Sequence, residues 1–258
     1  MPRIALTIAG SDPSGGAGLQ ADLRTFHQFG VYGTTVVTLI TVQNTVRASR
    51  VETLDAGLVG EQIDAILQDL PPGAVKTGAL GTAAIVEAVA SRNFDCPMVI
   101  DPVMIGKHGA HLIDADARSA LRRLLLPRAS LVTPNLDEAR ELAGIEVRDS
   151  DAILEAAKRI ADFGVPSVLI KGGHLAGDAV DILWHGGIFS EYRSPRLETR
   201  HTHGTGCTYS AAITACLAQG FSIPDAVGKA KKFIHEAIRT APGLGAGSGP
   251  LNFWAAPL

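Results

Sequence analysis

Short apolar runs alternate with amphipathic stretches along nearly the whole chain, and this alternation restricts the possible folds more than any other feature. The first run, 3–10, precedes a segment in which Leu19, Leu23 and Phe26 recur at the spacing of one helix face. Repeated alternation of this kind predicts an α/β protein with a central, mostly parallel sheet covered by helices on both faces. The further strands are predicted at 34–43, 73–80, 97–104, 129–135 and 166–174, with a hairpin at 180–193. The helices are predicted at 18–30, 61–70, 83–92, 114–126, 136–144, 151–164, 207–219 and 224–239.

The composition of the chain argues against several classes of binding partner. Apolar residues make up 46% of the 258 residues and the net charge is −3, which is typical of a globular chain and argues against nucleic acid as a partner. The three cysteines form no CxxC pair, so neither a zinc site nor a disulfide framework is indicated. The sequence shows no signal peptide and no apolar run of membrane-spanning length. We therefore expect a cytoplasmic protein with no membrane partner.

Polar and glycine-containing motifs follow the predicted strands. In a parallel sheet, ligands bind in the crevice outside the carboxyl ends of the strands. The sequence therefore predicts one binding crevice at that edge of the sheet. The motifs, in chain order, are AGSD, VQNT, KTGAL, DPVM, TPN and KGGH.

Two glycine-rich loops are the strongest candidates for binding. The segment 9–22 follows the first strand, but it lacks the closing Gly-Lys-Ser/Thr of a Walker A loop and the spacing of a dinucleotide fingerprint. The segment 203–212 (HGTGCTYSAA) leads into a predicted helix, where the N–H groups of residues 204–207 would form an anion site. A plain structural turn is the alternative for each loop, and we favour binding for both.

Taken in order, seven motifs resemble the ribokinase superfamily: AGSDPSGGAGLQADL, VQNT, VKTGAL, DPVM, TPNLDEA, KGGH and HGTGCTYSAAI. Within it, the chain is similar to the hydroxymethylpyrimidine/phosphomethylpyrimidine kinases of thiamine biosynthesis. The resemblance implies a three-layer α/β/α sandwich, with one domain over residues 1–258. It also implies ATP-dependent phosphorylation of 4-amino-5-hydroxymethyl-2-methylpyrimidine and then of its monophosphate. The alternatives are a pyridoxal or pyridoxine kinase of the same superfamily and a pyrimidine-binding regulator without catalysis.

The resemblance also assigns roles on the nucleotide side. The catalytic anion hole falls on Gly204, Thr205, Gly206 and Cys207, and Lys171 resembles the lysine that contacts nucleotide phosphates. A lysine at a strand end can also simply extend to solvent. Nucleotide binding falls on Lys171, Asn135, Thr205 and Gly206.

Magnesium is the second implied cofactor, with Glu138 as its ligand and Asp101 supporting the ion or its waters. Mg²⁺ keeps several waters and takes few protein ligands, which suits so small a set. The alternative for Glu138 is that an acid in the first turn of a helix is favourable on its own.

For the pyrimidine, the resemblance implies Asp22 and Gln43, because a carboxylate and an amide can both hydrogen-bond a heteroaromatic ring. Gly10, Lys76 and Ala79 are expected in the same pocket, and Ala79 replaces the methionine of many relatives. A solvent-facing helix acid is the alternative for Asp22. Relatives are commonly dimers, so a homodimer is expected, with the hairpin near 180–200 as a candidate interface.

Cys207 has two readings that remain open. It can act as a base for the alcohol, since a helix N-terminus lowers the pKa of a thiol below its usual value of about 8.5. It can instead be a small residue that shapes the anion hole. His203, one residue before that loop, can contact phosphate or serve a structural role. The glycine-rich stretch 243–250 is either near the nucleotide or a flexible tail.

Overall fold

The computed structural model describes residues 3–106, 109–172 and 177–257. Within these ranges the strands form one nine-stranded sheet in the order β3-β2-β1-β4-β5-β6-β7-β8-β9. Six neighbouring strands of the sheet are parallel to one another: β2, β1, β4, β5, β6 and β7. At one edge β3 pairs antiparallel with β2, and at the other edge β8 pairs antiparallel with β7 and β9 with β8. The strands are β1 (Arg3–Ser11), β2 (Val31–Gln43), β3 (Ala48–Thr53), β4 (Ala74–Thr77), β5 (Met98–Ile100), β6 (Leu131–Val132), β7 (Ser167–Lys171), β8 (Ala179–His185) and β9 (Ile188–Ser194).

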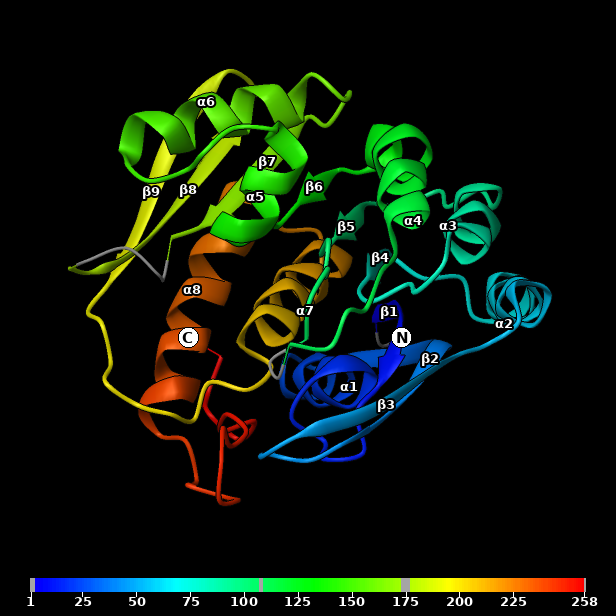
Figure 1. Cartoon of the computed structure of the whole chain (residues 1–258), viewed down its shortest axis with the longest axis horizontal. Helices are drawn as coiled ribbons and strands as arrows, with labels where there is room; N and C mark the ends of the chain where they lie inside the picture. The colour runs from blue at the N-terminus through cyan, green and yellow to red at the C-terminus, as the bar shows by residue number, and fades with distance from the viewer. Residues whose placement is uncertain (1–2, 107–108, 173–176, 258) are drawn as a thin grey trace.

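Helices cover both faces of this sheet, which confirms the predicted three-layer α/β/α arrangement (Figure 1). One buried apolar cluster joins the sheet to α2, α3, α4, α5 and α6, and a second joins it to α1, α7 and α8. The helices are α1 (Gly18–Gln28), α2 (Ala56–Asp69), α3 (Ala83–Ala90), α4 (Ala115–Ala120), α5 (Leu136–Ala143), α6 (Ser150–Ala161), α7 (Thr205–Ala218) and α8 (Ile223–Arg239). No helix among the described residues is long and apolar enough to cross a membrane.

Local signals explain several helix ends. Asp114 caps α4 by accepting a hydrogen bond from the Ala117 N–H at 2.7 Å. Gly144 ends α5 in the left-handed region at φ 66°, where glycine carries no steric penalty. After α4 the helix widens into a π-helical turn at Leu121–Leu125 and tightens into a 3₁₀ turn at Leu126–Arg128. The single helix predicted over 114–126 is therefore built of three segments.

Strand β3 was not predicted. Its sequence, ASRVET, is mostly polar, and four of its six residues are exposed because it pairs only with β2 at the edge of the sheet. Apolar patterning therefore does not mark it. Strands β5 and β6 are shorter than the apolar runs that contain them. The last two residues of the KGGH motif lie outside the described residues.

The parallel strands deliver their carboxyl ends to the same edge of the sheet. β1 ends at Ser11, β2 at Gln43, β4 at Thr77 and β7 at Lys171, each at a motif that the sequence marked as a candidate. Asp101 directly follows β5. The fold thus gathers motifs that are far apart along the chain.

Candidate functional site

A cavity of about 550 Å³ opens at this edge of the sheet. Its walls come from the ends of the parallel strands, the loop after β1, the start of α7 and one side of α8. Of the residues predicted for the site, Asp22 alone does not line it. The lining includes Gly10, Gln43, Lys76, Ala79, Asp101, Asn135, Glu138, Lys171, Gly204, Thr205, Gly206 and Cys207.

The start of α7 forms one wall of the cavity. Gly204 precedes the helix with φ 79°, and a Cβ there would lie 1.8 Å from the Gly16 carbonyl oxygen, so only glycine fits. The Thr205 N–H donates to the Thr202 carbonyl at 3.3 Å, which leaves Gly206 and Cys207 as the next N–H groups of the turn. The first turn of α7, all of it described, carries no acidic residue. An anion is therefore favoured at this helix end.

Lys171 and Asp101 form an ion pair beside this turn. Lys171 Nζ donates to Asp101 Oδ1 at 2.9 Å, and Thr133 Oγ1 donates to the same oxygen at 3.2 Å. A Cβ on Gly206 would lie 3.3 Å from Lys171 Nζ, so the ammonium lies against the start of α7. Burial opposes the charge on Asp101, but the charges of Lys171 and Lys76 outweigh it and lower the pKa of this carboxyl. The pair places a cation beside the first turn of α7, the helix end at which an anion is favoured.

Glu138 is both a helix-capping residue and a cavity residue. Its Oε2 accepts from the Asn135 N–H at 2.9 Å, and Asn135 Oδ1 accepts from the Glu138 N–H at 2.9 Å, which forms a capping box. Burial raises the pKa of Glu138 to about 7, against the opposing charge of Lys171. Glu138 therefore caps α5, as the structural alternative expected, and the same carboxyl group titrates near neutral pH.

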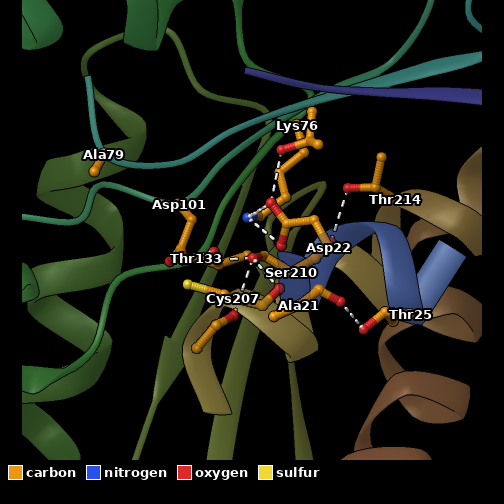
Figure 2. A network of polar contacts seen from close by, with 12 residues as sticks. Ala21, Asp22, Thr25, Lys76, Ala79, Asp101, Thr133, Cys207, Ser210 and Thr214 are labelled. Atoms are coloured by element: carbon orange, nitrogen blue, oxygen red, sulfur yellow. Dashed lines mark hydrogen bonds and ion pairs between the residues drawn. The ribbon is translucent and has the colours of Figure 1, made fainter. Parts of the chain in front are cut away.

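Asp22 is not among the residues that line the cavity, and its side chain faces that of Lys76 (Figure 2). Its two carboxylate oxygens accept from Lys76 Nζ at 2.8 and 2.7 Å, and Oδ2 also accepts from Thr7 Oγ1 at 2.6 Å. Both charged side chains are fully buried. This geometry differs from the expected contact between Asp22 and a pyrimidine ring. Asp22 is connected to the cavity through Lys76, which lines it, whereas Asp22 itself does not.

Cys207 faces the same cavity, close to Lys76 (Figure 2). Burial raises the pKa of its thiol to about 11, although the Lys76 charge and a hydrogen bond from the Gly18 backbone act in the opposite direction. The expectation of a lowered pKa was wrong for the protein without substrates, because desolvation outweighs the helix N-terminus. The thiol is therefore protonated at neutral pH.

Two cavity residues form a buried pair that the sequence did not indicate. Asp12 and His203 are both buried, and His203 Nε2 lies 2.8 Å from Asp12 Oδ2. Their separation of 191 residues hides the pair from sequence patterns. The available signal was an aspartate followed by Pro-Ser-Gly-Gly, a composition in which the carboxylate bonds the backbone of its own turn.

The glycine-rich stretch 243–250 packs against the turn after β2. The Ser248 N–H donates to the Thr45 carbonyl at 2.8 Å, and the Gly247 N–H donates to Thr45 Oγ1 at 3.3 Å. No residue of this stretch is among those lining the cavity. It is a packed segment and not a flexible tail, and its Gly249 carbonyl accepts from the N–H of the cavity residue His203 at 3.1 Å; its place near the nucleotide stays a prediction.

Comparisons with known proteins agree with this geometry. The sequence matches the family described as phosphomethylpyrimidine kinase over residues 12–252. It is 45% identical over 260 residues to the hydroxymethylpyrimidine/phosphomethylpyrimidine kinase of Staphylococcus aureus (strain MSSA476), covering 98% of this chain and 94% of that protein. It is 47% identical over 251 residues to the thiamine biosynthesis bifunctional protein ThiED of Geobacter sulfurreducens. That match covers 96% of this chain but only 51% of the bifunctional protein.

Two solved structures show the same fold over nearly the whole chain. A Bacillus subtilis pyridoxal kinase in complex with ADP has a TM-score of 0.92 and 40% identity, covering 99% of this chain and 98% of that one. A phosphomethylpyrimidine kinase from Clostridium difficile 630 has a TM-score of 0.82 and 42% identity, covering 92% of this chain and 99% of that one.

Proposed function

Because this chain belongs to the phosphomethylpyrimidine kinase family, we propose that it transfers the γ-phosphoryl group of ATP twice. The first acceptor is the hydroxymethyl group of 4-amino-5-hydroxymethyl-2-methylpyrimidine, and the second is the phosphate of the monophosphate that results. Each transfer breaks the bond between the β-γ bridging oxygen and the γ-phosphorus, forms a bond from the acceptor oxygen to that phosphorus, and releases ADP. Since ATP is the donor, we place the enzyme in the cytoplasm.

One observation carries this proposal: Gln43 and Ala79, which we call the acceptor lobe, line the same cavity as the first turn of α7, which we call the anion-binding turn. Gln43 and Ala79 line the acceptor side, and the start of α7 with Lys171 lines the other. Phosphoryl transfer depends mainly on positioning and on neutralising charge, and this arrangement supplies both. On this proposal the side-chain amide of Gln43 bonds the ring, while Lys171 and the N–H groups of Gly206 and Cys207 hold the transferred phosphate.

The test is a coupled assay of ADP release with the alcohol and with its monophosphate as separate acceptors. We expect Mg²⁺-dependent turnover of both. Turnover of the alcohol alone would remove the second transfer from the proposal. Tight binding of the pyrimidine without ADP release would instead favour the non-catalytic regulator.

Pyridoxal phosphorylation is the second candidate, because the Bacillus subtilis pyridoxal kinase covers this chain at a TM-score of 0.92. Ala79 lines the cavity and is small, which leaves room for a differently substituted ring. We place the pyrimidine first because curated relatives that are 43–45% identical to this chain are named hydroxymethylpyrimidine/phosphomethylpyrimidine kinase. The ratio of kcat/KM for pyridoxal to kcat/KM for the pyrimidine decides between the two.

The carboxylates at the cavity suit a magnesium ion that keeps most of its water. No group of three or more His, Cys, Asp or Glu side chains in the described part of the chain is arranged to hold a metal. Mg²⁺ needs no such group, since it is commonly held by one or two carboxylates and the substrate phosphates. Glu138 would hold the ion or its waters, and Asp101 would support them. When bound, the ion neutralises charge on the transferring phosphate.

A pH dependence follows from the raised pKa of Glu138. A carboxyl with a pKa of about 7 is mostly protonated below neutral pH and binds a metal only after it loses the proton. As the pH rises toward 7, the Mg²⁺ concentration that gives half the maximal rate should therefore fall by up to about tenfold per pH unit, and above pH 7 it should level off. Activity measured across Mg²⁺ concentrations from pH 5.5 to 8.5 checks this. Glu138→Gln is the control: it should bind Mg²⁺ weakly at every pH, and an unchanged dependence in this variant would assign the effect to ATP.

The homodimer remains a prediction, with the β8–β9 hairpin (Ala179–Ser194) as its candidate interface. Sedimentation equilibrium of the full chain measures the oligomeric state directly.

A further inference from the structure

The buried carboxylate of Asp12 gathers hydrogen bonds from two loops that flank the cavity. From its own loop it accepts the N–H groups of Ser14, Gly16 and Ala17 at 2.8, 3.2 and 2.8 Å, together with the Ser14 hydroxyl. From the loop before α7 it accepts His203 Nε2 at 2.8 Å. One side chain therefore ties the segment after β1 to the segment that leads into the anion-binding turn.

The two loops also touch through their backbones. A Cβ on Gly16 would lie 2.5 Å from His203 Cδ2, and a Cβ on Gly204 would lie 1.8 Å from the Gly16 carbonyl oxygen. Contacts this close require glycine in both loops. The Asp12–His203 bond thus spans an interface that is packed without a gap, and a shift of one loop must move the other.

Charge strengthens the connection. Burial alone would raise the pKa of Asp12, but hydrogen bonds from His203, Ser14 and Gln43 outweigh it and lower the pKa of this carboxyl far below its usual value. Asp12 is therefore ionised at neutral pH, and an ionised carboxylate only accepts, so His203 Nε2 carries the proton of this bond. Charge-assisted bonds of this kind are among the stronger ones in proteins.

The partners of Asp12 belong to opposite sides of the cavity. Gln43 lines the acceptor lobe, and its side chain helps lower the pKa of Asp12. His203 is bonded directly to Gly204, the residue that precedes the anion-binding turn. We propose that Asp12 and His203 are positioning residues that hold the acceptor lobe and the anion-binding turn in register for transfer. This inference rests on the proposed kinase function for its catalytic consequence, but its structural claim is independent of that function.

The test compares two substitutions at one position. His203→Leu removes the donor to Asp12, whereas His203→Gln retains a donor, because the glutamine amide nitrogen can take the place of Nε2. Ser14→Ala is the matched control, since it removes a donor to Asp12 without touching the loop before α7. Each full-length variant is examined by amide hydrogen exchange and by steady-state kinetics on the acceptor that the wild type phosphorylates.

We expect His203→Leu to speed amide exchange of Thr205 and Thr208, whose N–H groups donate to the Thr202 and Gly204 carbonyls, by about tenfold or more, while His203→Gln and Ser14→Ala leave it near the wild-type rate. We also expect His203→Leu to lower kcat by about 100-fold, with KM for each substrate changed less than about threefold, because misplacement harms transfer more than binding. His203→Gln should restore most of kcat.

Each contrary outcome has its own meaning. Unchanged exchange in His203→Leu overturns the positioning role, whatever happens to activity. Faster exchange with an unchanged kcat overturns its importance for transfer. A loss in His203→Gln equal to that in His203→Leu assigns His203 a role other than donation to Asp12. A wild type that phosphorylates no acceptor contradicts the proposed function alone, since hydrogen exchange still judges the connection between the loops.

Discussion

Replacing Cys207 by alanine should slow phosphorylation of the alcohol by about 100-fold or more, while phosphorylation of the monophosphate falls by less than about tenfold. The reason is the difference between the two acceptors. An alcohol must lose its proton during transfer, whereas a phosphate oxygen is already anionic. Cys207 faces the cavity at the start of α7, where a thiolate would lie close to Lys76. Separate measurements of kcat and KM on each acceptor check this result.

The raised pKa of the Cys207 thiol sharpens this prediction. At a pKa of about 11 the free protein holds almost no thiolate at neutral pH, so a base role requires that the thiol first lose its proton to solvent and then accept the proton of the alcohol during transfer. Cys216→Ala is the matched control, because Cys216 lies in the same helix, is fully buried and does not line the cavity. Equal losses on both acceptors in Cys207→Ala would mean that the residue only shapes the anion-binding turn.

Replacing Lys76 by methionine should lower the free energy of unfolding by about 3–5 kcal/mol, because it leaves the Asp22 carboxylate buried without its cation. For a chain of this size that corresponds to a fall in Tm of roughly 10 °C. Urea unfolding followed by circular dichroism measures the change. The same variant also removes a cation whose charge favours the Cys207 thiolate, so activity on the alcohol should fall even at temperatures where the protein stays folded.

Two control variants distinguish the loss of the Asp22–Lys76 ion pair from the loss of side-chain packing. The double variant Asp22→Leu with Lys76→Met removes both charges and should recover much of the lost stability, since a buried ion pair can be replaced by apolar groups at little cost. Arg50→Met breaks the exposed pair with Glu52 and should leave the free energy of unfolding nearly unchanged. A double variant as unstable as Lys76→Met alone would contradict the ion-pair explanation.

Asp22 differs from its expected role because it is fully buried and does not line the cavity, and sequence patterns do not show how deeply a residue is buried. The expectation placed its carboxylate against a ring. In the structure Asp22 lies on the buried face of α1 and meets Lys76, 54 residues away, at the end of β4. Whether a polar residue lines a cavity or lies beneath it depends on how far a helix sits from a strand end.

The sequence by itself determined the order of strands and helices apart from β3, the parallel sheet, and the glycine turn at which α7 begins. These depend on local patterns: apolar periodicity marks buried faces, and glycines mark backbone that no side chain permits. It also identified twelve of the residues that line the cavity, because the carboxyl ends of parallel strands meet at one edge of the sheet, but it did not identify the wall formed by α8. The sequence did not predict the polar edge strand β3, because an exposed edge strand buries few side chains and so shows little apolar periodicity.

Only the tertiary structure decided how the charged groups are used. It paired Asp22 with Lys76, Asp101 with Lys171, and Asp12 with His203 across 191 residues. It also buried Cys207, so that desolvation reversed the shift in thiol pKa expected from a helix N-terminus. The physical reason is common to all four cases. The state of an ionisable group depends on its distance from water and from other charges, and both distances are set by parts of the chain remote in sequence.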